Sequence, residues 1–269
     1  MALDLRQRKV LLTGASRGLG AHIARGLAER GATLILTARD ETQLADTAAA
    51  CEALGAPVTV LAADLARADE RASLSSAAGE VDILINNAGV EYTRRLLDQT
   101  DAQVEAQLAL NLTAPIDLTR RALPGMIARG RGTIVNVSSM SGKGATPYNS
   151  VYAATKSGLT GFSASLRIEL LGTGVHVAVV CPGFVSAGMW GRTGLRAPLA
   201  LREVKPEKVS RAVLRAIDGA PEVLVTAGPV RPLLALRELF PGIEAPALRA
   251  MGILRALERR ADALEQTKD

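Results

Sequence analysis

The chain has 269 residues, of which 48% are hydrophobic and 22% charged, with a formal net charge of +5. So much apolar material argues against a disordered chain. The basic residues are spread along the chain without interleaved aromatics, which disfavours nucleic-acid binding and suits an anionic small-molecule ligand. Cys51 and Cys181 lie far apart, and the apolar run near the N-terminus is too short to predict a secretory signal. We therefore expect a reducing, cytoplasmic location.

Short aliphatic segments rich in β-branched residues recur along the chain and predict strands. They are residues 9–14, 32–38, 57–64, 81–89, 132–139, 174–183 and 222–227. Between most of them lie longer stretches, such as 21–31 and 41–55, in which apolar residues recur every three or four positions. This alternation predicts a parallel sheet with helices on both faces. The expected fold class is a doubly wound, Rossmann-type α/β fold of about seven strands in three layers.

The composition changes after residue 228. No linker or repeat interrupts the alternating pattern before that point, so we expect one dinucleotide-binding and catalytic domain over residues 1–228. Residues 229–269 contain two helical patterns interrupted by prolines, which predict a C-terminal helical extension packed on the same domain or on a partner subunit. A membrane-surface helix is the less favoured alternative, because the polar face of the second pattern carries both signs of charge. The apolar stripe of that pattern consists of Leu248, Met251, Leu254, Leu257, Ala261 and Leu264.

The first predicted strand leads into the stretch TGASRGLG, residues 13–20, and then into a helix. Its three glycines would allow a tight turn and bring backbone N–H groups close to a phosphate at the start of the helix. The spacing TGxxxGxG is typical of the short-chain dehydrogenase/reductase family, which the sequence resembles from about residue 9 to 206. The other motifs that carry the resemblance are NNAG at residues 86–89, Asn111, Ser139 in NVSS, Tyr152 and Lys156 in YAATK, and Pro182-Gly183.

The resemblance implies that a nicotinamide dinucleotide binds at the carboxyl ends of the strands. Ser186 stands where the family often has threonine, and its hydroxyl can still donate one hydrogen bond. The implied cofactor contacts are Thr13, Gly14, Ser16, Arg17, Gly18, Leu19, Gly20, Arg39, Asp64, Leu65, Asn87, Ala88, Gly89, Tyr152, Lys156, Pro182, Gly183, Val185 and Ser186.

The end of the second predicted strand bears on the choice between the two nicotinamide cofactors. An acidic residue at this position binds the adenosine ribose and repels a 2′-phosphate. This chain has Ala38 there, followed by Arg39, and Arg17 lies in the glycine-rich turn. Two guanidinium groups suit a phosphate, so NADP(H) is the preferred cofactor. NAD(H) is the alternative if the strand extends to Asp40, but we prefer to interpret Asp40 as the N-cap of the following helix.

Tyr152 is the predicted acid/base. A tyrosine has a pKa of about 10, so a nearby positive charge is needed for it to act as a base at neutral pH. Lys156 lies one helical turn after Tyr152 on the same face, whereas Tyr148 has no such lysine. Strand alternation points Ser138 and Ser139 in opposite directions at the end of the fifth predicted strand, and the spacing of the family that the sequence resembles selects Ser139. The Ser139 hydroxyl would bind the substrate oxygen.

The resemblance completes the catalytic set with Asn111, which would hold a water that links Lys156 to solvent. Residues 185–202 are expected to close over the substrate, and this apolar segment with three arginines suggests a lipid-like or anionic substrate. No metal is predicted, because neither histidine lies in a metal-ligand spacing. The candidate substrate-pocket residues are Ser141, Tyr148, Met189 and Trp190.

These residues predict an NADP(H)-dependent oxidoreductase that interconverts a ketone or aldehyde and an alcohol. One alternative is an NAD-linked alcohol or hydroxysteroid-type dehydrogenase. A second, from a different class, is a catalytically silent nucleotide sensor or scaffold, although such a protein has no need of the tyrosine hydroxyl. The family resemblance also implies a homodimer or homotetramer, and no nucleic-acid partner is expected.

Overall fold

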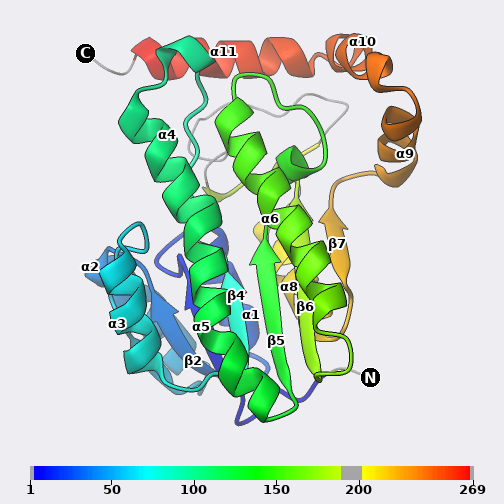
Figure 1. Cartoon of the computed structure of the whole chain (residues 1–269). Coiled ribbons are helices and arrows are strands. Elements are labelled where there is room, and N and C mark those ends of the chain that lie inside the picture. Colours follow the sequence, from blue (N-terminus) through cyan, green and yellow to red (C-terminus); the bar gives the residue numbers. More distant parts are fainter. Residues whose placement is uncertain (1–2, 189–201, 267–269) are drawn as a thin grey trace.

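The computed structural model describes residues 3–188 and 202–266, and a seven-stranded sheet forms its centre (Figure 1). All neighbouring strands are parallel, in the order β3-β2-β1-β4-β5-β6-β7. The predicted Rossmann-type fold is confirmed. The strands are β1 Lys9–Thr13, β2 Thr33–Thr37, β3 Val58–Val60, β4 Ile83–Asn86, β5 Gly132–Val137, β6 Val175–Pro182 and β7 Glu222–Val225.

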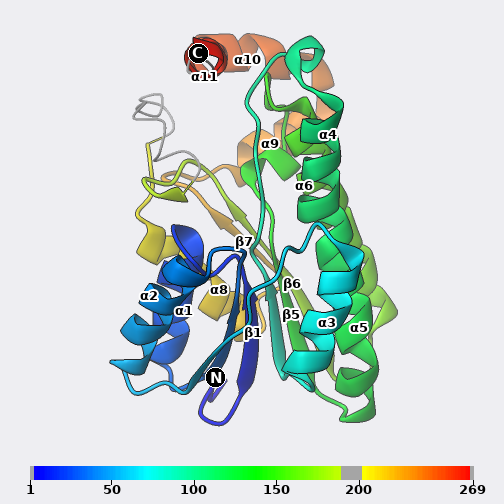
Figure 2. The same ribbon diagram turned by 90° about the vertical axis from the view of Figure 1, so that its left-hand side faces the viewer.

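Helices cover both faces of the sheet, and each face has its own apolar core (Figure 2). Strand alternation separates the cores: Val10 and Leu12 of β1 belong to one, and Leu11 to the other. The first core is covered by α1 Leu19–Ala28, α2 Glu41–Glu52 and α8 Pro206–Ile217. The second is covered by α3 Ala68–Ala78, α5 Ala114–Ala128 and α6 Ser150–Glu169.

The long helical stretch before β5 is not a regular α-helix throughout. It consists of α4 Asp101–Leu108, a π-helical turn η2 Ala109–Thr113, and α5. Such turns insert one extra residue and change the direction of the side chains around them. In this stretch the π turn carries Asn111, which is fully buried.

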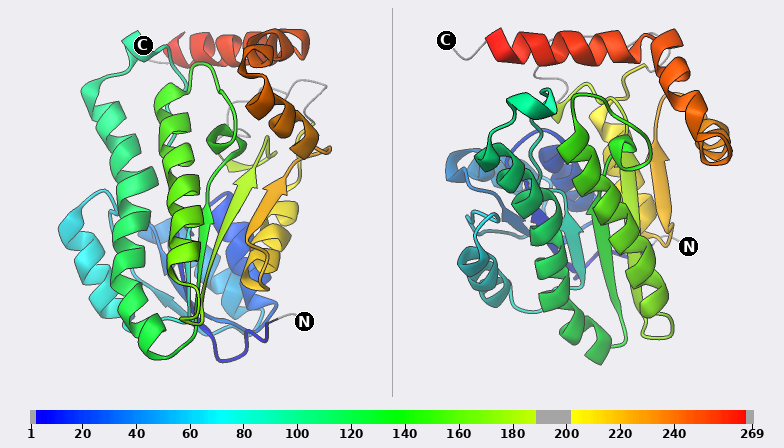
Figure 3. Two further views of the ribbon diagram at one scale, coloured as in Figure 1. Left: turned by 45° about the vertical axis from the view of Figure 1, so that its right-hand side comes forward. Right: turned by 45° about the horizontal axis from the view of Figure 1, so that its top comes forward.

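The C-terminal extension lies across the carboxyl end of the sheet, above α4 and α6 (Figure 3). It consists of α9 Arg231–Leu239, η5 Pro241–Ile243, α10 Glu244–Ala250 and α11 Ile253–Gln266. Ile253 and Leu257, which is only 2% exposed, pack with Leu248, Met251 and Phe184. Part of the predicted apolar stripe is therefore buried on the chain's own domain; the Leu264 side chain lies outside the described residues. Among the described helices, none combines the length and apolar composition needed to cross a bilayer.

Candidate active site

Two adjoining cavities lie at the carboxyl ends of the strands, where the strand order reverses between β1 and β4. The first has a volume of about 620 Å³ and lies over the glycine-rich turn and the ends of β2 and β3. The second has a volume of about 230 Å³ and contains the predicted serine, tyrosine and lysine. Leu19, Asn87 and Gly89 line both. A topological switch point of this kind is where open α/β sheets bind ligands.

The turn between β1 and α1 has a backbone that requires glycine. Gly14 and Gly18 have φ angles of +65° and +57°, and a Cβ on Gly20 would collide with the carbonyl oxygen of Gly14. The N-cap of α1 is Gly18, so no side chain of the capping residue occupies the N–H groups at this end of the helix. The first turn of α1 also has no acidic residue. The N–H groups at this end of α1 are therefore suited to an anion in the first cavity.

Arg17 and Arg39 line the outer part of the first cavity, together with Asp40 and Gln43. Strand β2 ends at Thr37, and Asp40 caps α2 by accepting hydrogen bonds from the backbone N–H of Gln43 at 3.0 Å and from its side-chain amide at 2.5 Å. The interpretation of Asp40 as a helix cap is confirmed. The cap engages the Asp40 carboxylate, and Arg17 and Arg39 line the same cavity.

Thr13 joins the glycine-rich turn to the loop after β4. Its hydroxyl donates to the carbonyl oxygen of Ile85 at 3.3 Å and accepts from the backbone N–H groups of Asn87 and Ala88 at 2.9 and 3.0 Å. The Asn87 amide donates in turn to the carbonyl oxygens of Thr13 and Gly14 at 2.9 and 3.1 Å. Thr13 is buried and does not line the cavity, but its hydrogen bonds hold Asn87 and Ala88, which do.

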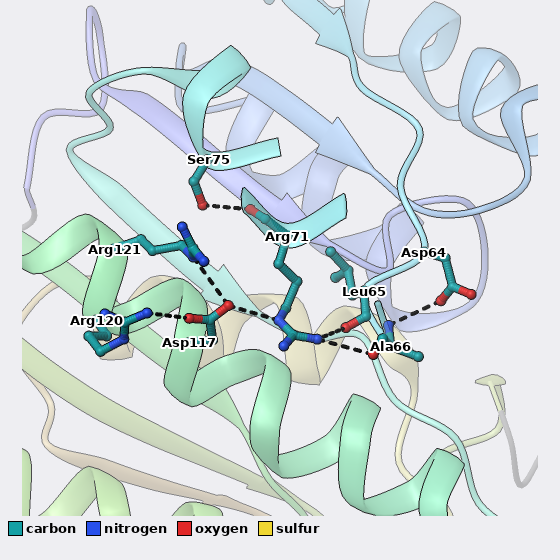
Figure 4. Close-up of polar contacts among 8 residues, drawn as sticks. All are labelled: Asp64, Leu65, Ala66, Arg71, Ser75, Asp117, Arg120 and Arg121. Carbon is teal, nitrogen blue, oxygen red and sulfur yellow. Dashed lines mark hydrogen bonds and ion pairs between the residues drawn. The ribbon is translucent and has the colours of Figure 1, made fainter. Parts of the chain in front are cut away.

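Asp64 and Leu65, which line the first cavity, belong to a loop that a buried arginine holds (Figure 4). Arg71 of α3 donates to the carbonyl oxygens of Leu65 and Ala66 at 2.9 and 3.1 Å. Its Nε also donates to Asp117 of α5 at 2.9 Å. The cavity wall after β3 is thus fixed to two helices on the same face of the sheet.

Asp117 is the centre of this network (Figure 4). It accepts further hydrogen bonds from Arg120 at 2.9 Å and from Arg121 at 3.1 Å. Burial alone would raise the pKa of Asp117, but the hydrogen bonds from Arg71 and these two arginines lower it to about 2. Asp117 is therefore ionised over the whole physiological range.

Ser139 follows β5, and both Ser139 and its neighbour Ser138 line the second cavity. Their hydroxyl groups have different partners. The Ser138 hydroxyl is occupied by the carbonyl oxygen of Lys156 at 2.9 Å and by the hydroxyl of Thr160 at 3.0 Å. The Ser139 hydroxyl accepts from the backbone N–H of Ser141 at 3.1 Å. It also hydrogen-bonds Tyr152, so the two predicted catalytic hydroxyls lie together.

Tyr152 is only 6% exposed, and its environment keeps it protonated. Burial raises the pKa of Tyr152 above its ordinary value, and the negative charge of Glu91 raises it further. The hydrogen bond from Ser139 and the positive charge of Arg260 act in the opposite direction. The sequence suggested a tyrosine pKa lowered by a nearby cation, but burial outweighs that effect. Tyr152 is consequently protonated at neutral pH, the form in which it can donate a proton.

Lys156 lies beneath the tyrosine. Its Nζ donates to the carbonyl oxygen of Val137 at 3.0 Å and lies 5.7 Å from the centroid of the Tyr152 ring. Burial lowers the pKa of Lys156 to about 8, although the charge of Glu91 opposes this shift. The lysine is therefore mostly cationic at neutral pH.

Asn111 lies next to this lysine because the π turn directs it inward. Its Oδ1 accepts from the backbone N–H of Val90 at 2.8 Å, and its Nδ2 donates to the carbonyl oxygen of Val90 at 2.8 Å and to Thr155 at 3.2 Å. A Cβ on Gly89 would be 3.0 Å from Asn111 Oδ1 and 3.6 Å from Lys156 Nζ. The two side chains thus meet beside Gly89, and the role of Asn111 in holding a water stays a prediction.

Several of the other predicted site residues line one of the two cavities. Ser16 lines the first cavity. Ser141, Pro182, Gly183 and Val185 line the second. Met189 and Trp190 lie outside the described residues.

Two predicted contacts have other partners in the structure. The Ser186 hydroxyl lies 3.5 Å from the carbonyl oxygen of Val204, and Ser186 is not among the residues that line either cavity. Tyr148, with a φ of +64°, packs against α11, and its hydroxyl donates to Glu258 at 3.1 Å. We therefore correct its expected role: Tyr148 holds the extension in place instead of lining the catalytic cavity.

A buried ion pair that the sequence did not predict lies in the second cavity. Arg260 Nη1 of α11 lies 2.8 Å from Glu91 Oε1, which belongs to the loop after β4, and their side chains are 6% and 9% exposed. Leu248, Ile253 and Leu257 of the extension also line this cavity. One signal was available, because Arg260 stands three residues after Leu257 on the apolar face of its helix.

Within the described ranges, no group of three or more His, Cys, Asp or Glu side chains is arranged to hold a metal ion. Cys51 and Cys181 are both buried and form no disulfide.

The family described as short chain dehydrogenase matches the chain over residues 8–196. The chain belongs to this family. A ketoacyl reductase, HetN, from Nostoc sp. is 38% identical over 96% of this chain and 94% of that protein. This short-chain dehydrogenase is accordingly an oxidoreductase that acts on CH–OH or C=O groups.

Solved structures of this dehydrogenase family also resemble the chain. A short-chain dehydrogenase from Sphingobium yanoikuyae in complex with NADPH has a TM-score of 0.78 at 32% identity, covering 88% of this chain and 95% of that one. A metagenomic short-chain oxidoreductase in complex with NADP has a TM-score of 0.71 at 34% identity, covering 83% and 98%. Both likenesses place the present fold with nicotinamide-binding oxidoreductases.

Proposed function

We propose that this dehydrogenase uses NADP(H) and reduces a ketone or aldehyde to an alcohol. The observation that carries the proposal is the meeting of Ser139, Tyr152 and Lys156 in a cavity that adjoins the glycine-rich turn. In the reducing direction Tyr152 acts as the proton donor, and its hydroxyl is protonated at neutral pH as that role requires.

The residues of the first cavity fit a nicotinamide dinucleotide. The glycine-rich turn and the N–H groups of α1 would hold the pyrophosphate, and Arg17 and Arg39 would bind a 2′-phosphate. Asp64 and Leu65 would meet the adenine, and the backbone of residues 87–89 would lie against the ribose. Pro182, Gly183 and Val185 would cover the nicotinamide at the junction with the second cavity. When bound, this group supplies the hydride that reduces the carbonyl carbon.

The protein's own side chains would bind the substrate oxygen and provide its proton. Ser139 would donate a hydrogen bond to the carbonyl oxygen and stabilise the negative charge that develops on it. Tyr152, which is hydrogen-bonded to Ser139, would transfer its hydroxyl proton to the same oxygen. Lys156 would stabilise the tyrosinate by its charge, and a water held by Asn111 would bring the replacement proton from solvent.

The cofactor preference is tested with the double variant Arg17→Ala/Arg39→Ala. Charge-assisted hydrogen bonds contribute about 1.5–3 kcal/mol each, so we expect kcat/KM for NADPH to fall about a hundredfold and that for NADH to change much less. Arg211→Ala, an exposed arginine of α8 away from both cavities, is the matched control. A wild-type enzyme that prefers NADH would contradict the proposal and favour the NAD-linked alternative.

We also propose the homodimer or homotetramer that the family resemblance implies. Ile168 in the last turn of α6 and Leu171 in the turn that follows it are 67% and 75% exposed, and an interface would cover such apolar side chains. Sedimentation equilibrium tests this directly, and a monomer at micromolar concentration would contradict it.

A further inference from the structure

A third cavity, of about 400 Å³, lies between the C-terminal extension and the ends of β6 and β7. Most of the residues around it are apolar, as in sites that bind hydrophobic ligands. Its walls include Leu233 and Leu234 of α9, Ala247 and Leu248 of α10, and Met251. Most of the lining residues of this apolar space follow residue 196, where the family match ends.

The third cavity adjoins the catalytic cavity. Met140, Phe184, Leu248 and Ile253 line both of them. Met140 directly follows Ser139, and a Cβ on Gly183 would lie 3.6 Å from its Cγ, so the methionine lies at the boundary. Methionine is unbranched and adapts readily to a neighbouring ligand. A chain that starts at the Ser139 hydroxyl can therefore extend past Met140 into the third cavity.

Two of the three charged residues at the third cavity, Arg237 and Glu244, have structural partners. Arg237 donates to the carbonyl oxygen of Lys143 and lies 3.3 Å from Glu244, which accepts from the backbone N–H of Ala145 at 2.6 Å. These contacts fix α9 and α10 to the loop before α6. Arg202, the third charged residue at this cavity, is exposed to solvent. An uncharged chain fits the interior better than an ionic group, which would have to lose its hydration there.

We propose that the third cavity binds the hydrocarbon tail of the substrate, so that the enzyme reduces ketones or aldehydes with an extended apolar chain. The proposal rests on the proposed function, because it places the carbonyl group at Ser139 and Tyr152. The tail takes no part in the reaction. Its burial contributes to binding in proportion to the number of methylene groups removed from water.

The chain-length dependence of the wild-type enzyme is the first test. With NADPH and methyl alkyl ketones from butanone to undecanone, we expect kcat/KM to rise about fourfold for each methylene that enters the cavity, and then to level off. If butanone is reduced and kcat/KM does not rise along the series, the tail subsite is wrong and the proposed function stands. If no ketone of the series is reduced, the proposed function itself fails.

Filling the third cavity is the second test. Ala247→Phe places a ring in the wall formed by α10, and Ala245→Phe adds the same ring on the exposed side of that helix. We expect the ratio of kcat/KM for undecanone to kcat/KM for butanone to fall at least tenfold in the first variant and to stay constant in the second. Leu234→Trp fills the cavity from α9 and should act in the same way. Thermal melting identifies a variant that fails to fold, and an unchanged ratio in both folded cavity variants would overturn the proposal.

Discussion

The sheet domain and the C-terminal extension meet over the same cavity but contribute different things to it. Ser139, Tyr152 and Lys156 belong to the part of the chain that the family match covers. The extension adds Leu248, Ile253, Leu257 and Arg260 to the walls, and it encloses the third cavity. We propose that the first region provides the chemistry. In our account the second region selects the substrate and adjusts the electrostatic environment of the tyrosine.

The largest effect is expected within the sheet domain. Tyr152→Phe removes the proton donor without adding volume, and general acid catalysis accelerates such reactions about a hundred- to ten-thousandfold. We expect kcat for ketone reduction to fall about a thousandfold. NADPH binding, followed by fluorescence titration, should change little because the ring remains. If kcat for ketone reduction in Tyr152→Phe equalled that of the wild type, the proton would have to come from another group.

The buried Glu91–Arg260 pair joins the two regions, and breaking it should destabilise the fold. Removal of one partner takes the close opposite charge away from a buried charged group, at a cost of about 3 kcal/mol. We expect Glu91→Gln and Arg260→Gln each to lower the free energy of unfolding by about this amount in urea titrations. In the double variant the free energy of unfolding should fall by clearly less than the sum of the losses in the two single variants. If the loss in the double variant equals the sum of the two single losses, the extension is not held to the domain through this pair.

The pH dependence of reduction should follow Lys156. Its pKa is lowered to about 8, so the side chain is cationic below pH 8 and loses its charge as the pH rises through that value. Tyr152 remains protonated there because its pKa is raised. We expect kcat/KM for the ketone to decline above about pH 8. Glu91 raises the lysine pKa, so Glu91→Gln should move the decline to lower pH. A profile that is flat through pH 8 to 10 would contradict this assignment.

The smallest expected effect concerns Asp117, whose ion-pair partners Arg71, Arg120 and Arg121 belong to the sheet domain as well. Its pKa is about 2 in the folded protein against 3.8 for a free aspartate, so its stabilisation is complete above pH 3.8 and is lost as the pH falls towards 2. We expect Asp117→Asn to lower the free energy of unfolding by about 1–2 kcal/mol at pH 7. The difference from the wild type should shrink in urea titrations at pH 3. A difference that is constant with pH would exclude the charge as its cause.

The sequence was most informative where a signal is local. Strand and helix periodicity predicted the sheet, the spacing of Gly14 and Gly18 predicted the turn, and the interval between Tyr152 and Lys156 placed both on one helical face. Each of these depends on neighbours within about one or two turns of the chain.

Contacts between distant parts of the chain could not be predicted in this way. Glu91 and Arg260 are 169 residues apart, and their pairing depends on where α11 packs. Tyr148 shows the same limitation, because its partner Glu258 is 110 residues away. The raised pKa of Tyr152 follows from burial and from Glu91, neither of which is visible in its local motif.

The central claim is that this enzyme transfers a hydride to a carbonyl carbon while Tyr152 protonates the oxygen. The most direct measurement uses NADPH that carries deuterium at the transferred position, with an alkyl ketone as substrate. Our account predicts that the wild type places deuterium on the carbinol carbon of the alcohol and that Tyr152→Phe transfers very little. An alcohol product without deuterium, or full transfer by Tyr152→Phe, would contradict it.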